Sequence, residues 1–306
     1  MLKFIKPHIN VLIALVVYAM VFINQWVVED PSFIWWHVAL VIILALGFYA
    51  LSILLKWLFD FKTKKTKYSI EYIATAVIAW LPYLILICGI VVYFQMLLPL
   101  TPYPRIDPYL HRIDQLFGFD EGGIILDFQN QFSFLSPYFI GIYNQLNTAI
   151  ILTIALIPIF NWKSFERMFR IFFILIAITI VFYYFLPSYG PVYYFKNIHF
   201  NSGIEQMLTS ELALEANHSL APVYGIIACP SWHVLCALLI IFAWWPVKFY
   251  GLRYLILVFS ILLILSIFPT GEHYLADALC SFILFAIVYS LDKKISAIYN
   301  KNEQNL

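Results

Sequence analysis

Two histidines stand in short motifs that each open an apolar segment. His273 belongs to TGEHYLAD, residues 270–277, and Asp277 follows it by four positions. On a helix this spacing places both side chains on one face, so the carboxylate can accept from one imidazole nitrogen and leave the other free to attack. His233 belongs to CPSWHV, residues 229–234, and is a candidate acid for a leaving group. The motifs therefore predict nucleophilic catalysis with an acid partner.

The positions of both histidines also favour binding of an anion. Each lies in the predicted first turn of a helix, where backbone N–H groups lack partners and the helix dipole is positive. Two such helix starts, if they converge, would bind a phosphate oxygen. Ser231 and Thr270 are candidate helix caps or donors to that phosphate, and capping alone explains them equally well. Gly271 completes this predicted phosphate-binding group.

The elements that must position these motifs are transmembrane helices. The chain of 306 residues is 63% hydrophobic and only 11% charged, with a mean hydropathy of +0.87. This composition excludes an ordinary soluble domain and predicts a polytopic membrane protein with no nucleic-acid partner. The four cysteines show neither zinc-ligand nor disulfide-framework spacing. We therefore expect neither a metal nor a cofactor.

Hydropathy predicts an all-α fold of about eight transmembrane helices. The predicted spans cover residues 8–28, 33–59, 72–98, 138–160, 165–186, 231–245, 251–268 and 271–291. Two N-terminal helices and a basic loop form residues 1–68, a six-helix core forms residues 69–292, and a polar tail forms residues 293–306. The inserts 99–137 and 187–230 are predicted to be interfacial or external.

The distribution of positive charge predicts the orientation in the membrane. With eight spans both termini lie on one side, and that side holds all of the 18 Lys and Arg residues except Arg105, Arg112 and Lys196. By the positive-inside rule the termini are cytoplasmic and both histidine motifs face the external side. The abundance of Ile, Phe, Tyr, Asn and Lys is typical of an AT-rich genome and favours a bacterial inner membrane.

PSWH followed by GEHYLAD resembles the paired motifs, PSxH and HxxxD, of the type 2 phosphatidic acid phosphatase (PAP2) superfamily. The resemblance covers the six-helix core, and residues 105–120 are similar to a stretch of the inositol phosphorylceramide synthase-like branch. It implies that His273 attacks phosphorus to give a phosphohistidine and that Asp277 orients it. It also implies that His233 protonates the leaving oxygen and later deprotonates the acceptor. The family chemistry implies no metal.

Two parts of the phosphatase pattern are absent from this chain. The family serine is present as Ser266, but the arginine expected beside it is Ile267. The upstream KxxxxxxRP motif has its nearest counterpart in YGPVYYFK, residues 189–196, which offers Tyr189 and Lys196. A phosphate monoester brings close to two negative charges and needs several cationic contacts, whereas a diester brings one. The missing cations therefore favour a phosphodiester.

These observations predict a membrane phosphotransferase with membrane lipids as donor and acceptor. It would move a head group such as phosphoinositol from a glycerophospholipid to a lipid alcohol such as ceramide. A phosphatase of the same superfamily, acting on lipid phosphates or polyprenyl pyrophosphates, is the first alternative. A transporter or scaffold with polar helix ends is the second.

Other polar residues are weaker candidates for substrate contact. Asn144 and Asn147 lie in a polar cluster at the predicted external end of a span, where contact with a head group and helix-to-helix hydrogen bonding are both reasonable. Arg105, Arg112 and Lys196 are candidate phosphate ligands, although lipid-headgroup contacts or loop salt bridges are commoner roles.

Three acidic residues have bland interpretations. Asp107 and Asp114 are seven residues apart and would face the same way on a helix, but a third metal ligand is missing. Glu272 occupies a favourable position for an acid beside a helix start, and this explanation is preferred to head-group binding.

Overall fold

The computed structural model describes residues 101–195 and 228–304, with residues 198, 205, 208, 209 and 212 between them. These residues form helices and contain no strand. The helices are α4 (Asp107–Leu116), α5 (Glu121–Asn130), α6 (Ser136–Tyr143), α7 (Leu146–Phe160), α8 (Trp162–Phe185), α9 (Pro191–Tyr194), α11 (Trp232–Trp244), α12 (Tyr250–Thr270) and α13 (Leu275–Gln304). The three spans predicted within residues 8–98 lie outside the described part.

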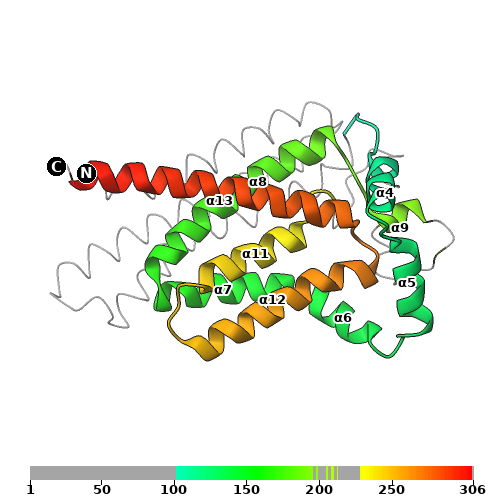
Figure 1. Cartoon of the computed structure of the whole chain (residues 1–306), viewed down its shortest axis with the longest axis horizontal. Coiled ribbons are helices and arrows are strands. Elements are labelled where there is room, and N and C mark those ends of the chain that lie inside the picture. Colours follow the sequence, from blue (N-terminus) through cyan, green and yellow to red (C-terminus); the bar gives the residue numbers. More distant parts are fainter. Residues whose placement is uncertain are drawn as a thin grey trace, which may run out of the picture.

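Helix α11 lies at the centre of the arrangement. It contacts α7, α8, α12 and α13, so it is the helix around which the others are organised (Figure 1). The start of α11, the end of α12 and the start of α13 all lie at one end of the bundle. The short helices α4 and α5 lie at this same end, opposite the C-terminal end of α13 (Figure 1). Both histidine motifs are therefore brought to one end of the bundle.

The described helices indicate an integral membrane protein. Three are long and apolar enough to cross a membrane, namely Lys163–Phe185, Tyr250–Thr270 and Leu275–Lys294. Helices α6 and α7 would make a fourth span, but they are bent by 44° at the break between them. The span predicted over 138–160 is thus present as a broken pair of helices. The break falls at Asn144 and Gln145, and asparagine is among the residues whose side chain can compete with the helical backbone for hydrogen bonds.

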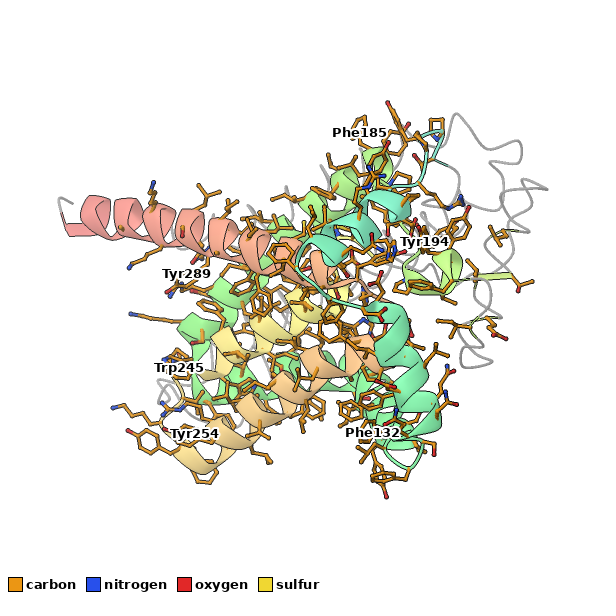
Figure 2. All side chains as sticks on the ribbon, turned by 45° about the vertical axis from the view of Figure 1, so that its right-hand side comes forward. Phe132, Phe185, Tyr194, Trp245, Tyr254 and Tyr289 are labelled. Carbon is orange, nitrogen blue, oxygen red and sulfur yellow. The ribbon has the colours of Figure 1, made fainter. Side chains whose placement is uncertain are left out.

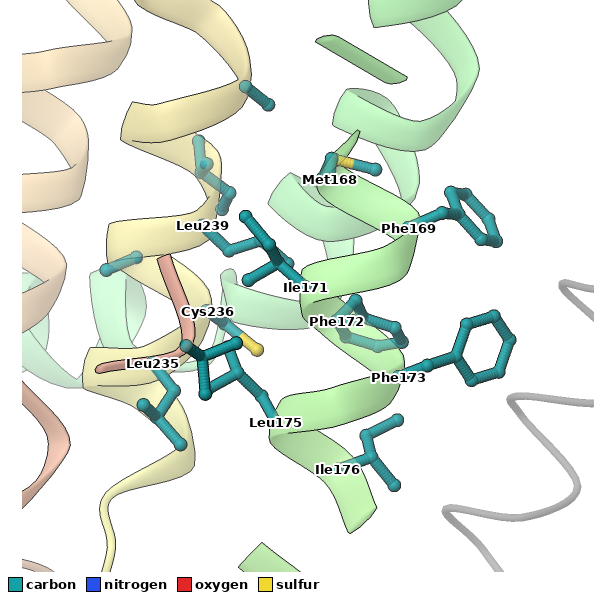
Figure 3. Close-up of a cluster of buried hydrophobic side chains, with 14 of the residues drawn as sticks. Met168, Phe169, Ile171, Phe172, Phe173, Leu175, Ile176, Leu235, Cys236 and Leu239 are labelled. Carbon is teal, nitrogen blue, oxygen red and sulfur yellow. The ribbon is translucent and has the colours of Figure 1, made fainter. Parts of the chain in front are cut away.

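The contact between α8 and α11 is apolar throughout its length. Ile171 and Leu175 of α8 point toward Leu235, Cys236 and Leu239 of α11 (Figure 3). Since lipid tails are as apolar as these side chains, van der Waals packing rather than removal from water stabilises such a contact in a bilayer. This packing fixes α11, and hence the position at which His233 begins it.

The two ends of the bundle carry different polar features. Away from the histidines, the buried carboxylate of Asp292 on α13 accepts from Arg167 and Arg170 of α8, each at 2.9 Å. Exposed aromatic side chains lie at both ends of the bundle, and tryptophan and tyrosine are enriched at membrane interfaces in general. The labelled examples are Phe132, Phe185 and Tyr194 near the histidine end, and Trp245, Tyr254 and Tyr289 near the other (Figure 2).

Candidate active site

The structure brings the two histidines together from separate helices. Their ring centroids are 5.7 Å apart and the rings meet edge to face. His273 is only 2% exposed, and His233 is partly buried. The hydroxyl of Ser281 on α13 donates to the Asp277 carbonyl at 2.7 Å and also lies 3.2 Å from the Ser231 carbonyl, so the start of α11 lies against α13. The predicted convergence of the two motifs is therefore present.

The sequence predicts His273 in the first turn of a helix. In the structure it lies in the turn before α13 instead. Its Nδ1 atom lies 3.0 Å from the carbonyl oxygen of Ala228. Because a carbonyl can only accept, Nδ1 must carry the hydrogen in this contact. In the neutral ring Nε2 is then unprotonated and keeps its lone pair. Ala228 thus selects the tautomer that makes His273 a nucleophile.

Asp277 lies beside His273 as predicted, although its main hydrogen bond is to the backbone. Its Oδ2 atom is 3.6 Å from Nδ1 of His273 and accepts from the Tyr274 N–H at 2.9 Å. The carboxylate is fully buried. Since an opposite charge in a buried site is weakly screened, it would stabilise His273 whenever that ring becomes positively charged.

The start of α13 is not available to a phosphate, contrary to prediction. Asp114 of α4 accepts from the N–H groups of Leu275 and Ala276, each at 2.7 Å. With the Tyr274 N–H bonded to Asp277, the first N–H groups at this helix start are occupied by carboxylates. At the other helix start, Ser231 is the predicted cap and accepts from the Val234 N–H at 3.4 Å.

Asp107 lies on the same face of α4 as Asp114. It holds the loop that contains Tyr189 and Gly190 in the same manner. It accepts from the N–H groups of Tyr189 and Gly190, at 3.1 and 2.7 Å, and from the Ser188 hydroxyl at 3.2 Å. Burial raises the pKa of both Asp107 and Asp114 to about 6, against the opposing effect of these N–H donors. The two aspartates bind backbone, and no metal-binding cluster occurs among residues that the structure describes.

Glycine is required where the loop held by Asp107 meets the turn that contains His273. Gly190 has φ of +84°, and a Cβ atom there would lie 2.2 Å from the Glu272 carbonyl oxygen. The Val192 N–H donates to the Gly271 carbonyl at 3.1 Å. Gly271 itself has φ of +75° and ends α12, while the Thr270 hydroxyl donates to the Ile267 carbonyl at 3.0 Å. Thr270 therefore closes α12 instead of capping α13.

Tyr143, at the end of α6, contacts the second histidine. Its ring stacks on His233 with centroids 3.7 Å apart and an interplanar angle of 21°. Its hydroxyl donates to Oε2 of Glu272, the residue before His273. Burial raises the pKa of Glu272 to about 7, while the Tyr143 hydroxyl and nearby His273 oppose the rise. Tyr143 had no motif to mark it, and only its place beside the helix break singles it out.

Two of the three predicted cationic contacts lie in the part of the chain that the structure describes. The Arg105 guanidinium lies over the ring of the buried Tyr189, 4.0 Å from its centroid. Arg112 is exposed on the face of α4 opposite Asp107 and Asp114, and Lys196 lies outside the described residues. Arg105 and Tyr189 thus form a cation–π contact at the loop that α4 holds.

The structure also places Ile267 and the two asparagines that the sequence singled out. Ile267, where the phosphatase pattern has arginine, is fully buried with Tyr143, Val234 and Ala278. The site therefore holds an apolar contact where a cation would stand. Among the polar candidates, Asn144 and Asn147 are both exposed next to the end of α6.

The fold and the paired histidines define a helical membrane protein whose buried site can supply a nucleophile and an acid. Residues 108–291 match the family model of the PAP2 superfamily, and the chain belongs to this superfamily. Its members are generally phosphatases or phosphotransferases. Searches of curated proteins and of solved structures return no match.

Proposed function

We propose that this protein is a lipid phosphotransferase that passes a phosphodiester-linked head group between membrane lipids. The donor is a glycerophospholipid such as phosphatidylinositol, and the acceptor is a lipid alcohol such as ceramide. The observation that carries the proposal is the contact of His273 Nδ1 with the Ala228 carbonyl, because it leaves Nε2 unprotonated in a ring whose centroid is 5.7 Å from that of the second histidine. An attacking nitrogen and an adjacent proton carrier are what transfer through a covalent intermediate requires.

The reaction divides into two displacements at phosphorus. In the first, His273 Nε2 forms a bond to phosphorus, and the bond from phosphorus to the glycerol oxygen breaks. His233, initially protonated, gives its proton to that oxygen, so diacylglycerol leaves. In the second, neutral His233 takes the proton from the acceptor hydroxyl while its oxygen attacks phosphorus. The nitrogen–phosphorus bond then breaks and frees His273.

The charges around the histidines favour a diester over a monoester. Ile267 replaces an arginine, and Asp114 occupies the N–H groups at the start of α13. Asp277 adds a carboxylate beside His273, and Glu272 adds a second one at pH values above its raised pKa of about 7. A dianionic phosphate in such a site would meet net repulsion, whereas a diester brings a single negative charge. This environment supports transfer of a diester.

The test compares the two classes of substrate on one preparation of the purified full chain. Phosphatidylinositol labelled in its head group is supplied with ceramide, and phosphatidic acid is supplied in parallel. We expect labelled phosphorylceramide product and little free phosphate. Release of phosphate from phosphatidic acid without any labelled ceramide product would overturn transfer and leave the phosphatase alternative. Turnover of neither substrate class by the wild type would overturn both.

A further inference from the structure

We propose that Tyr143 is a positioning residue for the acid histidine, anchored by Glu272. Its role is to hold the His233 ring at the angle and distance from His273 that protonation of a leaving oxygen requires. This inference rests on the proposed function, since it assigns a task within that reaction. It concerns a residue outside both histidine motifs.

Tyr143 fixes the tilt of the His233 ring by stacking on it. The two ring centroids are 3.7 Å apart and the interplanar angle is 21°, so the imidazole plane follows the plane of the phenol ring. Tyr143 is itself buried, and its hydroxyl donates to the Glu272 carboxylate, so the phenol ring is held in place in turn. Stacking therefore restricts the orientation of the acid.

Glu272 connects this arrangement to the nucleophile. Its carboxylate accepts from the Tyr143 hydroxyl, and it directly precedes His273 in the chain. Its carbonyl is fixed against Gly190, where no side chain could be accommodated. The position of Tyr143 is consequently set by the same turn that contains His273. The spacing of the two histidines is thereby maintained across α6, α11 and the turn before α13.

The side chain of Tyr143 is tightly packed, which restricts its movement. Its side chain is 7% exposed and lies in an apolar cluster with Val234 and Ile267. Directly after it, α6 ends at the break before α7. The side chain that stacks on His233 is therefore supplied by the last residue of α6.

The test exploits the dependence of acid catalysis on the leaving group. One donor is phosphatidylinositol, whose alkoxide must be protonated as it departs. The other is p-nitrophenyl phosphoinositol, whose nitrophenolate departs without an acid. The rate measured is that of the first displacement in a single turnover, because His233 also serves as the base of the second displacement with either donor. Tyr143→Leu should lower this rate about 100-fold on the first donor, the lower end of what a general acid contributes. On the second donor the same variant should lose less than about 3-fold in the release of nitrophenolate.

Matched variants separate positioning from folding. Phe172→Leu removes an aromatic ring that packs on Trp232, one residue from His233, without touching the imidazole. It should affect both donors equally and only slightly. His233→Gln provides the reference and should show the same dependence on leaving group as Tyr143→Leu. If His233→Gln itself shows none, the assignment of His233 as acid fails, and with it the proposed mechanism.

Equal losses of Tyr143→Leu on both donors, with a normal His233→Gln reference, would overturn the positioning role alone. The anchor is examined by a double-mutant cycle. Tyr143→Phe and Glu272→Gln should each cost about 3- to 10-fold on phosphatidylinositol, as expected for one hydrogen bond, and the double variant should cost no more than either. Additive losses would remove Glu272 from the proposal.

A spectroscopic measurement tests the proposal independently of turnover. Dipolar couplings of the histidine rings, measured by nuclear magnetic resonance, should be those of a fixed ring for His233 in the wild type and should be reduced by ring motion in Tyr143→Leu. The couplings of His273 should stay unchanged, because Ala228 holds that ring. Identical His233 couplings in the wild type and the variant would contradict the proposal even if no donor were turned over.

Discussion

The two histidines occupy neighbouring corners that are built in different ways. Around His273 the partners are main-chain atoms and buried carboxylates: the Ala228 carbonyl, Asp277 and, one turn along, Asp114. Around His233 the stacked partner is Tyr143, supplied by a helix that ends at that point. The nucleophile is thus fixed by the course of the backbone, and the acid by a single side chain. Substitutions should therefore act differently in the two corners.

The largest expected effect follows loss of the nucleophile. His273→Ala should reduce transfer by at least about 10³-fold on every donor, whatever the leaving group, because the covalent step itself is lost. Asp277→Asn should lose only about 10- to 150-fold, the equivalent of one charge-assisted interaction, since Ala228 still selects the tautomer. Steady-state kinetics on purified variants provide the measurement. Equal losses for both variants would mean that the Ala228 contact contributes nothing.

The carboxylate that caps α13 should matter for folding more than any single apolar contact nearby. Asp114→Ala leaves the N–H groups of Leu275 and Ala276 without their partner and should lower the free energy of unfolding by about 2–4 kcal/mol. Thermal unfolding in detergent measures this loss. Asp127→Ala on α5, which removes an exposed carboxylate that accepts from the Gln131 side chain, is the control and should change little. Similar shifts for both variants would contradict the capping role.

A smaller effect is expected where the loop touches the nucleophile corner. Gly190→Ala combines a left-handed backbone with a Cβ atom at 2.2 Å from the Glu272 carbonyl, so it should cost about 1–3 kcal/mol of stability. Because Glu272 adjoins His273, turnover should also fall. Gly141→Ala on α6 meets no atom within 4 Å and should be neutral or slightly stabilising. If Gly190→Ala left both stability and turnover unchanged, the loop would be able to move away from the Glu272 carbonyl at little energetic cost.

The buried aspartates of α4 predict a modest pH dependence of stability. Their pKa is raised from 3.8 to about 6, so between these values the folded protein keeps protons that the unfolded chain has lost. Stability should therefore fall as pH rises through this interval and level off above it. Melting temperatures across the interval should decline less steeply for Asp114→Asn than for the wild type. An equal or steeper decline in the variant would contradict the assignment.

The candidate catalytic residues could be predicted from the sequence more readily than the residues that hold them in place. The spacing of His273 and Asp277, the Ser231 cap and the bounds of α8, α11 and α12 follow from periodicity and local propensity, which the structure retains. The partners of the histidines could not be foreseen in this way. Ala228 acts through a carbonyl that every residue possesses, and its position depends on tertiary contacts.

The roles of the α4 aspartates show the same limit. Asp107 and Asp114 were correctly placed on one helix face, yet their partners are N–H groups more than 80 positions away in the chain. The phosphate site predicted at the start of α13 failed for this reason, since Asp114 takes those donors first. Likewise, the break after Tyr143 interrupts a run that is apolar enough to be a single span.

The central claim, that His273 carries the transferred group, has a direct test. His233→Ala protein is mixed with p-nitrophenyl phosphoinositol labelled at phosphorus, and no acceptor is added. Nitrophenolate leaves without an acid, but the variant lacks the base that activates the next nucleophile, so the intermediate should accumulate. Peptide mapping should then find the label on His273, and the His233→Ala/His273→Ala protein should remain unlabelled. Label on another residue, or none while the wild type transfers, would contradict the claim.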